Sequence, residues 1–411
     1  MVQNEEISTP TESSPILTTN GETLPEGRYR LVGWSIDTTG RRLIDEICQI
    51  AAYTSSAQFA QYIMPYKDIN PKYIRRHMIR VINSGRYRML KDLKSNKFIK
   101  TKSAASALTD FTEWLEANRG DASDGIILVY YEVRKVSPAI LLETLHHYNL
   151  LDRFKSIVKG FANGYAIAQA KCSKTTKQYS LRLMSQLLLN KEEEELSSAV
   201  ERARAAYEVV VHLGQSERPD LDAKGSGDCT TGVEPHLVVF VLPYVGKIGA
   251  EEAEIAELKV LLQRQNTFRP VFGALMKSDR LQRQHASHLR RLLAENNIDY
   301  NKLKAAFEKD AKEGLEKVLK EEIPNAKSNE LTELLEILDC FFDPEKKPVQ
   351  PKPRTFNPQR RSRFNRQRKD SRNNQSANNV DVKVEPKGEL DSEVKVEPLE
   401  QLNNNLEAVQ A

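Results

Sequence analysis

The sequence predicts a mixed α/β domain followed by a smaller all-α module, with unfolded segments at both ends. Short runs rich in β-branched and aromatic residues alternate with amphipathic stretches in the first half of the chain, whereas the pattern between 250 and 342 is helical only. The two ends are too polar to bury a core. We therefore expect a disordered segment (1–26), an α/β domain (27–215), a linker (216–235), a helical module with a leading strand (236–345) and a disordered tail, basic and then acidic (346–411).

Three successive strands are expected at the start of the α/β domain. The runs YRLVGWSIDT, IDEICQIAAYT and AQFAQYIMP follow one another from Tyr29 with short connections, which is typical of an antiparallel meander. A helix is expected next, from about Pro71. Its apolar residues at helical spacing are Ile74, Met78, Ile79 and Ile82.

Helices and one buried strand account for the rest of this domain. Ser103 is placed to cap a helix that has a clear apolar stripe. The run GIILVYY (125–131) is continuously apolar and of strand length, which indicates a central buried strand. Further helices are expected around 138–148, 180–189 and 197–213.

The second half begins with a linker by composition at 214–232. HLVVFVLPY (236–244) then reads as one more strand or an extended connector. Breakers such as Asn, Asp and Pro separate the helices that follow. Those helices are 250–265, 270–277, 279–295, 300–320 and 328–342.

Length and composition exclude several classes of protein. The 411 residues are 39% hydrophobic and 29% charged, enough for two or three domains of about 150 residues. No stretch approaches about 18 consecutive apolar residues, and the N-terminus lacks the basic and apolar regions of a secretory signal. Cys48, Cys172, Cys229 and Cys340 are scattered, so we expect neither a zinc site nor a disulfide framework, and a reducing cytosol is the natural location.

The small net charge of +4 conceals strong segregation along the chain. The segment 67–102 contains twelve Lys and Arg residues against two acids, and 346–372 contains eleven against one. From residue 373 to the end, eight acids face three lysines. Two segments this basic favour a polyanionic partner.

Three motifs in order resemble those of the DEDD 3′–5′ exonucleases, which implies a ribonuclease H-like exonuclease fold with a mixed sheet. SIDTTG ends the first strand, LVYYE follows the buried strand, and SSAVERA opens the last helix of the domain. The corresponding family motifs are D-x-E-T, L-V-x-H-N followed by an Asp, and H-x-A-x-x-D-A. Their carboxylates hold two Mg²⁺ ions about 3.5–4 Å apart, which clamp the attacking and leaving oxygens.

Of the four acids that this resemblance requires, only Asp37 is present. An Arg beside a dication costs about 4 kcal/mol per charge pair at 4 Å with an effective dielectric near 20, and a Ser in place of the general-base His does not titrate near neutrality. We therefore expect a catalytically inactive domain without metal or cofactor. The degenerate positions are Ser35, Asp37, Val136 or Ser137, Ser197 and Arg202.

A second resemblance covers about residues 27–345. The stretches GWSIDTTG, VKGFANGYAIAQ, YSLRLMSQLL and FRPVFGALMKSDR resemble the exuperantia family of insect maternal proteins. This resemblance implies a sterile-alpha-motif-like (SAM-like) helical domain, a homodimer, and the binding of single-stranded or structured mRNA. It also implies a role in localising maternal mRNA in the germline for oocyte axis specification, in cytoplasmic ribonucleoprotein particles with transport components and without a membrane.

Two alternatives remain open at this point. One is a metal-dependent 3′–5′ exonuclease that uses displaced acids such as Asp45 or Glu132. The other is a protein scaffold that acts through its helical module alone.

The first candidate RNA-binding surface is the basic segment after the meander. On the expected helix, Arg76 and Arg80 would be i,i+4 neighbours, and Tyr73 and Tyr87 would be available to stack on unpaired bases. The alternative is a solvated helix face. The candidate cations are Lys72, Arg75, Arg76, Arg80, Arg86 and Arg88, with Lys91 beside them.

Two further basic clusters are candidates. The cluster in the helical module competes with a protein-contact role, and the Arg-rich tail, which also contains Phe356 and Phe364, competes with a nuclear-localisation signal. The residues are Arg280, Arg283, Arg290 and Arg291, with Lys277, His285 and His288, in the module, and Arg360, Arg361, Arg363, Arg366 and Arg368 in the tail.

The acidic tail contains the sequence VKVEP twice. Each copy has the apolar-Lys-x-Glu form read by the SUMO-conjugating enzyme. Lys383 and Lys395 are therefore possible SUMO acceptors.

Overall fold

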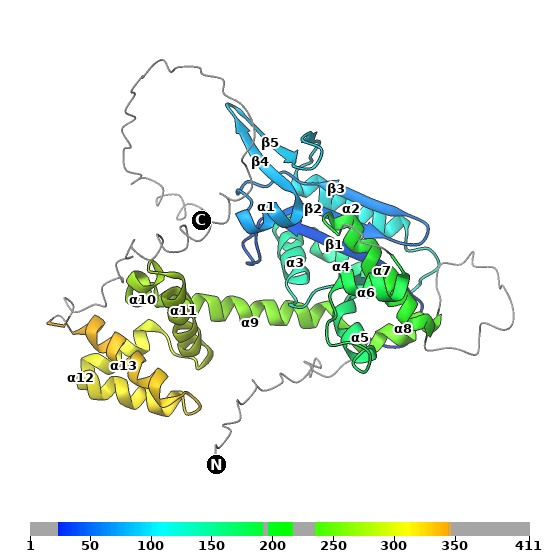
Figure 1. Ribbon diagram of the computed structural model, residues 1–411. Coiled ribbons are helices and arrows are strands. Elements are labelled where there is room, and N and C mark those ends of the chain that lie inside the picture. The colour runs from blue at the N-terminus through cyan, green and yellow to red at the C-terminus, as the bar shows by residue number, and fades with distance from the viewer. Residues whose placement is uncertain (1–23, 192–195, 217–234, 344, 347–411) are drawn as a thin grey trace, which may run out of the picture.

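A six-stranded mixed sheet forms the centre of the first domain in the computed structural model, which describes residues 24–191, 196–216, 235–343 and 345–346 (Figure 1). The order is β3-β2-β1-β7-β8-β9. β2 runs antiparallel to β1 and β3, β7 runs parallel to β1 and β8, and β9 runs antiparallel to β8. The meander and the buried strand are confirmed. The strands are β1 (Tyr29–Thr38), β2 (Ile47–Tyr53), β3 (Gln58–Tyr62), β7 (Gly125–Tyr130), β8 (Val158–Asn163) and β9 (Val245–Lys247).

Helices cover both faces of this sheet because strand residues alternate between the two faces. Val32, Trp34 and Ile36 pack with one group of helices, whereas Leu31 packs with the other. The expected cap is confirmed, since the Ser103 hydroxyl accepts a hydrogen bond from a backbone N–H of the first turn. The first group is α2 (Ala104–Ala117), α3 (Ser137–His147) and α4 (Leu151–Ile157), and the second is α5 (Gly164–Lys171), α6 (Leu181–Leu189), α7 (Ala199–Ser216) and α8 (Pro235–Val241).

The long helix expected from Pro71 is wrong beyond His77. Helix α1 (Pro71–His77) ends there because Met78 adopts a left-handed conformation with φ 56°. A separate three-stranded sheet follows and projects from the domain (Figure 1). Its hairpin turns at Gly85, whose φ of +57° suits glycine. The strands are β4 (Ile79–Ser84), β5 (Tyr87–Asp92) and β6 (Phe98–Ile99).

The sequence patterns did not predict five other elements correctly. HLVVFVLPY is helix α8 and a 3-10 turn (Leu242–Tyr244) rather than a strand, because a short run apolar throughout fits a buried helix equally well. Strands β8 and β9 and helices α4 and α5 were not anticipated. Their stability comes from pairing and packing with distant parts of the chain: β9 pairs with β8, and α8 packs in the core beneath α7.

The second half is helical, as expected. Helix α9 runs from the α/β domain to the other helices (Figure 1) and is tied to the domain by ion pairs such as Lys155–Glu252 at 2.8 Å. Phe268 and Phe272 centre a separate apolar core. No helix in the described ranges is long and apolar enough to cross a membrane. The helices are α9 (Ile248–Thr267), α10 (Arg269–Met276), α11 (Arg280–Glu295), α12 (Tyr300–Glu322) and α13 (Ser328–Phe342).

Candidate functional site

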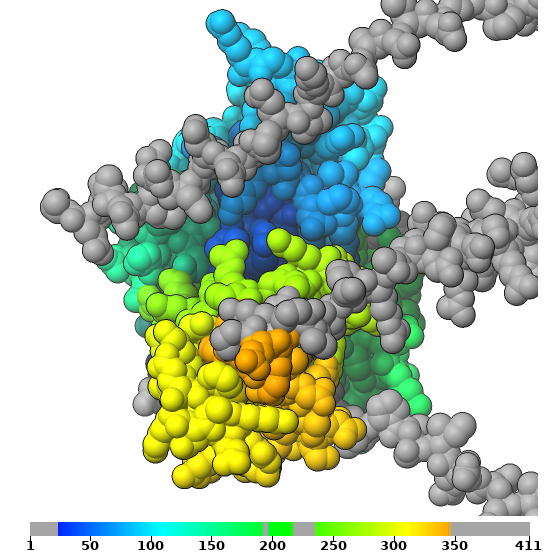
Figure 2. All heavy atoms as spheres, turned by 90° about the vertical axis from the view of Figure 1, so that its left-hand side faces the viewer, coloured from blue at the N-terminus to red at the C-terminus, as the bar shows by residue number. Residues whose placement is uncertain are grey.

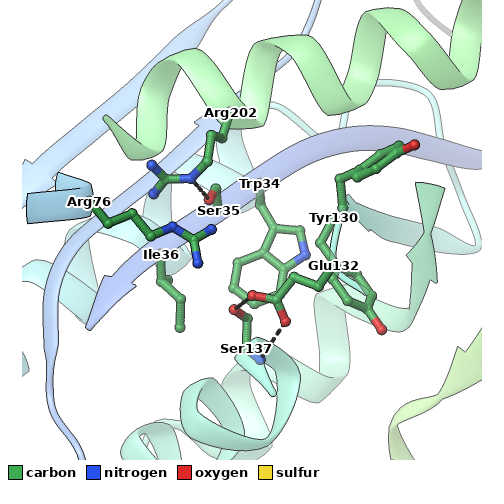
Figure 3. A pocket seen from close by; sticks show the side chains of 9 residues that line it. Trp34, Ser35, Ile36, Arg76, Tyr130, Glu132, Ser137 and Arg202 are labelled. Atoms are coloured by element: carbon green, nitrogen blue, oxygen red, sulfur yellow. Dashed lines mark hydrogen bonds between the residues drawn. The ribbon is translucent and has the colours of Figure 1, made fainter. Parts of the chain in front are cut away.

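A small pocket opens where the carboxyl end of β1 meets helix α7. The helix lies unusually close to the strand, since a Cβ added at Gly33 would come within 2.3 Å of the Ala203 carbonyl oxygen. This approach brings the start of α7 over the strand's polar end. Figure 3 shows the side chains that line the pocket. They are Trp34, Ser35, Ile36, Arg76, Tyr130, Tyr131, Glu132, Ser137 and Arg202.

Asp37 and Arg202 form a buried ion pair beside this pocket. One guanidinium nitrogen contacts Asp37 Oδ1, and Nε donates to the Ser35 hydroxyl at 3.3 Å. The remaining nitrogen, Nη1, donates to the carbonyl oxygens of Leu196 and Ser197 at 3.2 and 2.8 Å. The guanidinium is therefore held from three sides, as a buried charge must be if it is to persist.

His77 completes the surroundings of this carboxylate. Its Nδ1 lies 2.6 Å from Asp37 Oδ1. The ring is not aligned along that contact, however, and neither ring nitrogen has a well-directed hydrogen-bond partner in the part of the chain that the structure describes. His77 is the last residue of α1, so the helix end places it in the buried interior.

The environment sets the charge states of this cluster. Burial alone would raise the pKa of Asp37, but the Arg202 charge and the contact with His77 outweigh it, so the pKa of Asp37 lies below its ordinary value. Burial lowers the pKa of His77, and the Asp37 carboxylate opposes that shift only in part. At neutral pH the cluster is thus an Asp⁻–Arg⁺ pair beside an uncharged imidazole.

Glu132 is a carboxylate that does line the pocket, and its oxygens accept hydrogen bonds from the start of α3. Its Oε2 accepts the backbone N–H groups of Val136 and Ser137, both at 3.1 Å, and its Oε1 accepts the Ser137 hydroxyl at 2.6 Å. These bonds satisfy N–H groups that a helix leaves unpaired at its N-terminus. Figure 3 shows the carboxylate turned toward Ser137.

These residues do not fit a pair of divalent cations. Mg²⁺ needs several converging oxygen ligands, preferably carboxylates. Here one carboxylate is paired with a guanidinium and the other caps a helix, and no group of three His, Cys, Asp or Glu side chains within the described ranges could hold a metal. Asp45, the other acid considered as a displaced ligand, binds the side chain of Arg42 at 3.0 Å.

Two further residues, Ser197 and Arg76, lie close to Arg202. The Ser197 hydroxyl, which occupies the general-base position, accepts a hydrogen bond from Lys94 Nζ at 2.8 Å. Arg76 reaches in from α1 and lies on the same side of the pocket as Arg202 (Figure 3). Burial and the neighbouring Arg202 charge lower the pKa of Arg76. The side of the pocket that Arg76 and Arg202 line is therefore positive.

The structure separates the first RNA-binding candidates. Lys72, Arg75 and Arg76 lie on α1, whereas Arg80 lies on β4, so the expected i,i+4 pair does not exist. The Arg88 guanidinium is already hydrogen-bonded within the protein, since it donates to the Pro65 carbonyl oxygen, Asn83 and Asp68. Tyr73 is buried, so it is not free to stack on a base. Arg86 is exposed in the hairpin turn and Tyr87 at the start of β5.

In the helical module, the second candidate cluster is partly neutralised. Arg290 donates twice to the Gln265 carbonyl oxygen, and Arg291 pairs with Glu295 at 2.6 Å. Arg280 and Arg283 remain exposed on α11. The third candidates in the Arg-rich tail (Arg360, Arg361, Arg363, Arg366 and Arg368) and the two SUMO candidates lie outside the described residues.

Sequence reasoning missed two features of this site. His77 falls inside the helix expected from Pro71 through Ile82 and was not singled out, because no local pattern in the sequence marks it as a site residue. Glu132 was read as a displaced ligand or a surface acid, although Glu132 five residues before Ser137-Pro138 is a spacing that suits capping of the following helix.

Comparisons with known proteins match both folded parts. A family model described as "Exuperantia RNAse H-like domain" matches residues 29–188, and one described as "Exuperantia SAM-like domain" matches residues 269–341. Maternal protein exuperantia-1 of Drosophila pseudoobscura pseudoobscura is 39% identical over 84% of this chain and 76% of its own length. Maternal protein exuperantia of Drosophila melanogaster is 37% identical over 80% of this chain and 71% of its own length.

A solved structure also matches weakly. The crystal structure of a full-length 3′-exonuclease has a TM-score of 0.33 and 11% sequence identity, covering 53% of this chain and 97% of that chain. A likeness this low supports no statement about activity.

Proposed function

Since this chain belongs to the exuperantia family of maternal proteins, we propose that it is a non-catalytic RNA-binding adaptor for the localisation of maternal mRNA in the germline. Its exonuclease-like domain serves as a binding scaffold. The adaptor works as a homodimer in cytoplasmic ribonucleoprotein particles, together with transport components.

The Arg202–Asp37 ion pair is the observation that supports a non-catalytic domain. A two-metal nuclease needs at this position an acid that attracts cations, and here a guanidinium stands in its place and uses the one remaining acid as its counter-ion. Each metal would have to displace a cation that is held by two further carbonyl oxygens. Among the residues that the structure describes around the pocket, no water-activating base replaces the missing histidine, because Ser197 does not titrate and His77 is enclosed.

The charge distribution supports a polyanionic ligand. Cations cluster on α1, on the β4–β5 hairpin and on the loop that follows, and most of them are exposed. Phosphate contacts of this kind supply affinity without reading bases, so specificity requires further contacts.

End-labelled single-stranded RNA distinguishes the adaptor from an enzyme. Incubated with the full-length protein and Mg²⁺ or Mn²⁺, the RNA should be retained at about 150 mM salt and keep its length. Shortening with time, abolished by Asp37→Ala, would overturn the proposal in favour of an exonuclease. Failure to retain any RNA would instead favour a protein scaffold.

The assembly state is tested separately. Light scattering coupled to gel filtration should give twice the monomer mass of 46.8 kDa. A single species of monomer mass at micromolar concentration would remove the homodimer from the proposal.

A further inference from the structure

The three-stranded sheet has one covered face and one open face. Ile79, Val81, Leu90 and Ile99 point to the body of the domain and pack with Tyr73. Residues alternate along each strand, so their neighbours point outward. The pairing Arg80↔Lys91↔Phe98 crosses all three strands on the open side. We define the outer sheet face as Arg80, Ile82, Ser84, Tyr87, Met89, Lys91 and Phe98.

The outer sheet face carries positive charge only. It includes Arg80 and Lys91 and no Asp or Glu, and neither cation has an acidic partner among the described residues. The acid on β5, Asp92, pairs with Ile79 on the covered side and accepts hydrogen bonds from Lys94 and Ser95 in the next turn. An anion approaching this face therefore meets no internal competitor.

Two aromatic rings stand exposed on the same face. Tyr87 is 73% exposed and Phe98 is 57% exposed. Leaving such rings in water forgoes the stabilisation of about 25 cal/mol per Å² that burial would give, so two exposed rings on one small sheet face favour a contact surface. Lys91 Nζ lies 5.7 Å from the centre of the Phe98 ring, so cation and ring are presented together. Tyr87 lies four residues along β5 from Lys91, about 13 Å, so the two rings can meet different bases.

We propose that single-stranded RNA lies across the outer sheet face, with bases stacked on Tyr87 and Phe98 and phosphates bound by Arg80 and Lys91. This inference rests on the proposed RNA-binding function and names the surface and the ligand class. Exposed rings and cations on one face fit an unpaired strand, because its bases are free to stack, whereas duplex bases are enclosed. In Figures 1 and 2 the light-blue hairpin projects from the domain, so an extended strand has access to it.

The test is fluorescence anisotropy with the full-length protein and a fluorescein-labelled 12-nucleotide uridine RNA at 50 and 200 mM salt. Loss of one stacked ring weakens binding about 5- to 150-fold, so Tyr87→Ala/Phe98→Ala should raise Kd at least tenfold. Tyr87→Phe/Phe98→Tyr keeps both rings and should bind within about twofold of wild type. Tyr66→Ala is the matched control, because Tyr66 is 84% exposed directly before the basic segment (67–102) but lies off the sheet.

The charged pair gives an independent readout. Arg80→Ala/Lys91→Ala should weaken binding and reduce the slope of log K against log salt by about 1.4, since each phosphate contact on a single strand contributes about 0.7. Poly-L-glutamate should compete far less well than the uridine RNA.

The outcomes separate this inference from the proposed function. If wild type binds the RNA and Tyr87→Ala/Phe98→Ala binds within about twofold, the outer sheet face is not the platform, although the protein still binds RNA. Equal competition by poly-L-glutamate would overturn the stacked single-strand ligand in favour of a general anion surface. No binding by wild type would overturn the proposed function itself.

Discussion

Replacing Arg202 by Met tests the electrostatics of the degenerate site. The change leaves the Asp37 carboxylate buried without its main counter-ion, and it leaves two carbonyl oxygens without their donor. Removing one partner of a buried pair costs about 3–5 kcal/mol. With a urea m-value near 3 kcal/mol/M, the unfolding midpoint should fall by about 1–1.7 M at pH 7.

The effect has a defined pH dependence. In wild type the pKa of Asp37 is lowered, so the carboxylate stabilises the fold above its unfolded-state pKa, and that stability is lost as the pH falls through the folded-state value. Without Arg202, burial dominates and the pKa of Asp37 should rise above its ordinary value. The destabilisation should therefore be largest at pH 7 and shrink toward pH 4.5, where the carboxyl takes up a proton.

Two further variants complete the urea denaturation series. Asp37→Asn/Arg202→Met removes both charges and should recover to within about 1 kcal/mol of wild type. Arg204 lies two residues after Arg202 on α7, and Arg204→Met removes an exposed cation that contacts Glu208 at 2.8 Å. This control should lower the free energy of unfolding by less than about 1 kcal/mol. A loss below about 1 kcal/mol for Arg202→Met, without pH dependence, would refute the buried-pair reasoning.

Three further predictions concern stability, each measured by urea denaturation. Gly33→Ala places a methyl group 2.3 Å from a backbone carbonyl of α7 and should lower the free energy of unfolding by at least about 1–3 kcal/mol. The control Gly273→Ala in α10 meets nothing within 4 Å and should raise it by about 0.5–1 kcal/mol. Equal effects of the two variants would contradict the close strand–helix approach. Phe272→Ala leaves a cavity in the helical core and should lower the free energy of unfolding by about 3–5 kcal/mol. The control Leu281→Ala changes a side chain that is 76% exposed and should alter that free energy by less than about 0.5 kcal/mol. A small loss for Phe272→Ala would place the core elsewhere. Glu132→Ala removes the carboxylate that accepts the backbone N–H groups of Val136 and Ser137 at the start of α3, and it should cost about 1 kcal/mol; no loss would mean that water replaces the carboxylate.

Elements with strong local patterns were predictable from the sequence. The strands at 29–62 have β-branched runs, the helix from Ala104 has its cap at Ser103, and the helices after 250 have apolar stripes separated by breakers. The three-stranded sheet was not predictable in this way. Ile74, Ile79 and Ile82 fit a helical spacing as well as they fit a short helix followed by a strand. Only the packing of Ile74 and Ile79 against Tyr73 and Leu90 decides between the two.

The residue types at the site were also readable from the sequence. Ser35, Asp37 and Arg202 occupy three positions of the DEDD pattern, and their chemistry alone argues against two bound cations. What those side chains do required the tertiary structure. Asp37 and Arg202 are 165 residues apart, and they meet because Gly33 lets α7 lie directly on β1.

Local order, composition and charge therefore came from the sequence by itself, because each depends on residues close together in the chain. The partners of Asp37, the capping role of Glu132 and the gathering of rings and cations on one face of β4, β5 and β6 came only from the tertiary structure. The physical reason is that strand register and helix packing decide which distant side chains share a face or a pocket, and both are set by the burial of the whole core rather than by any one segment.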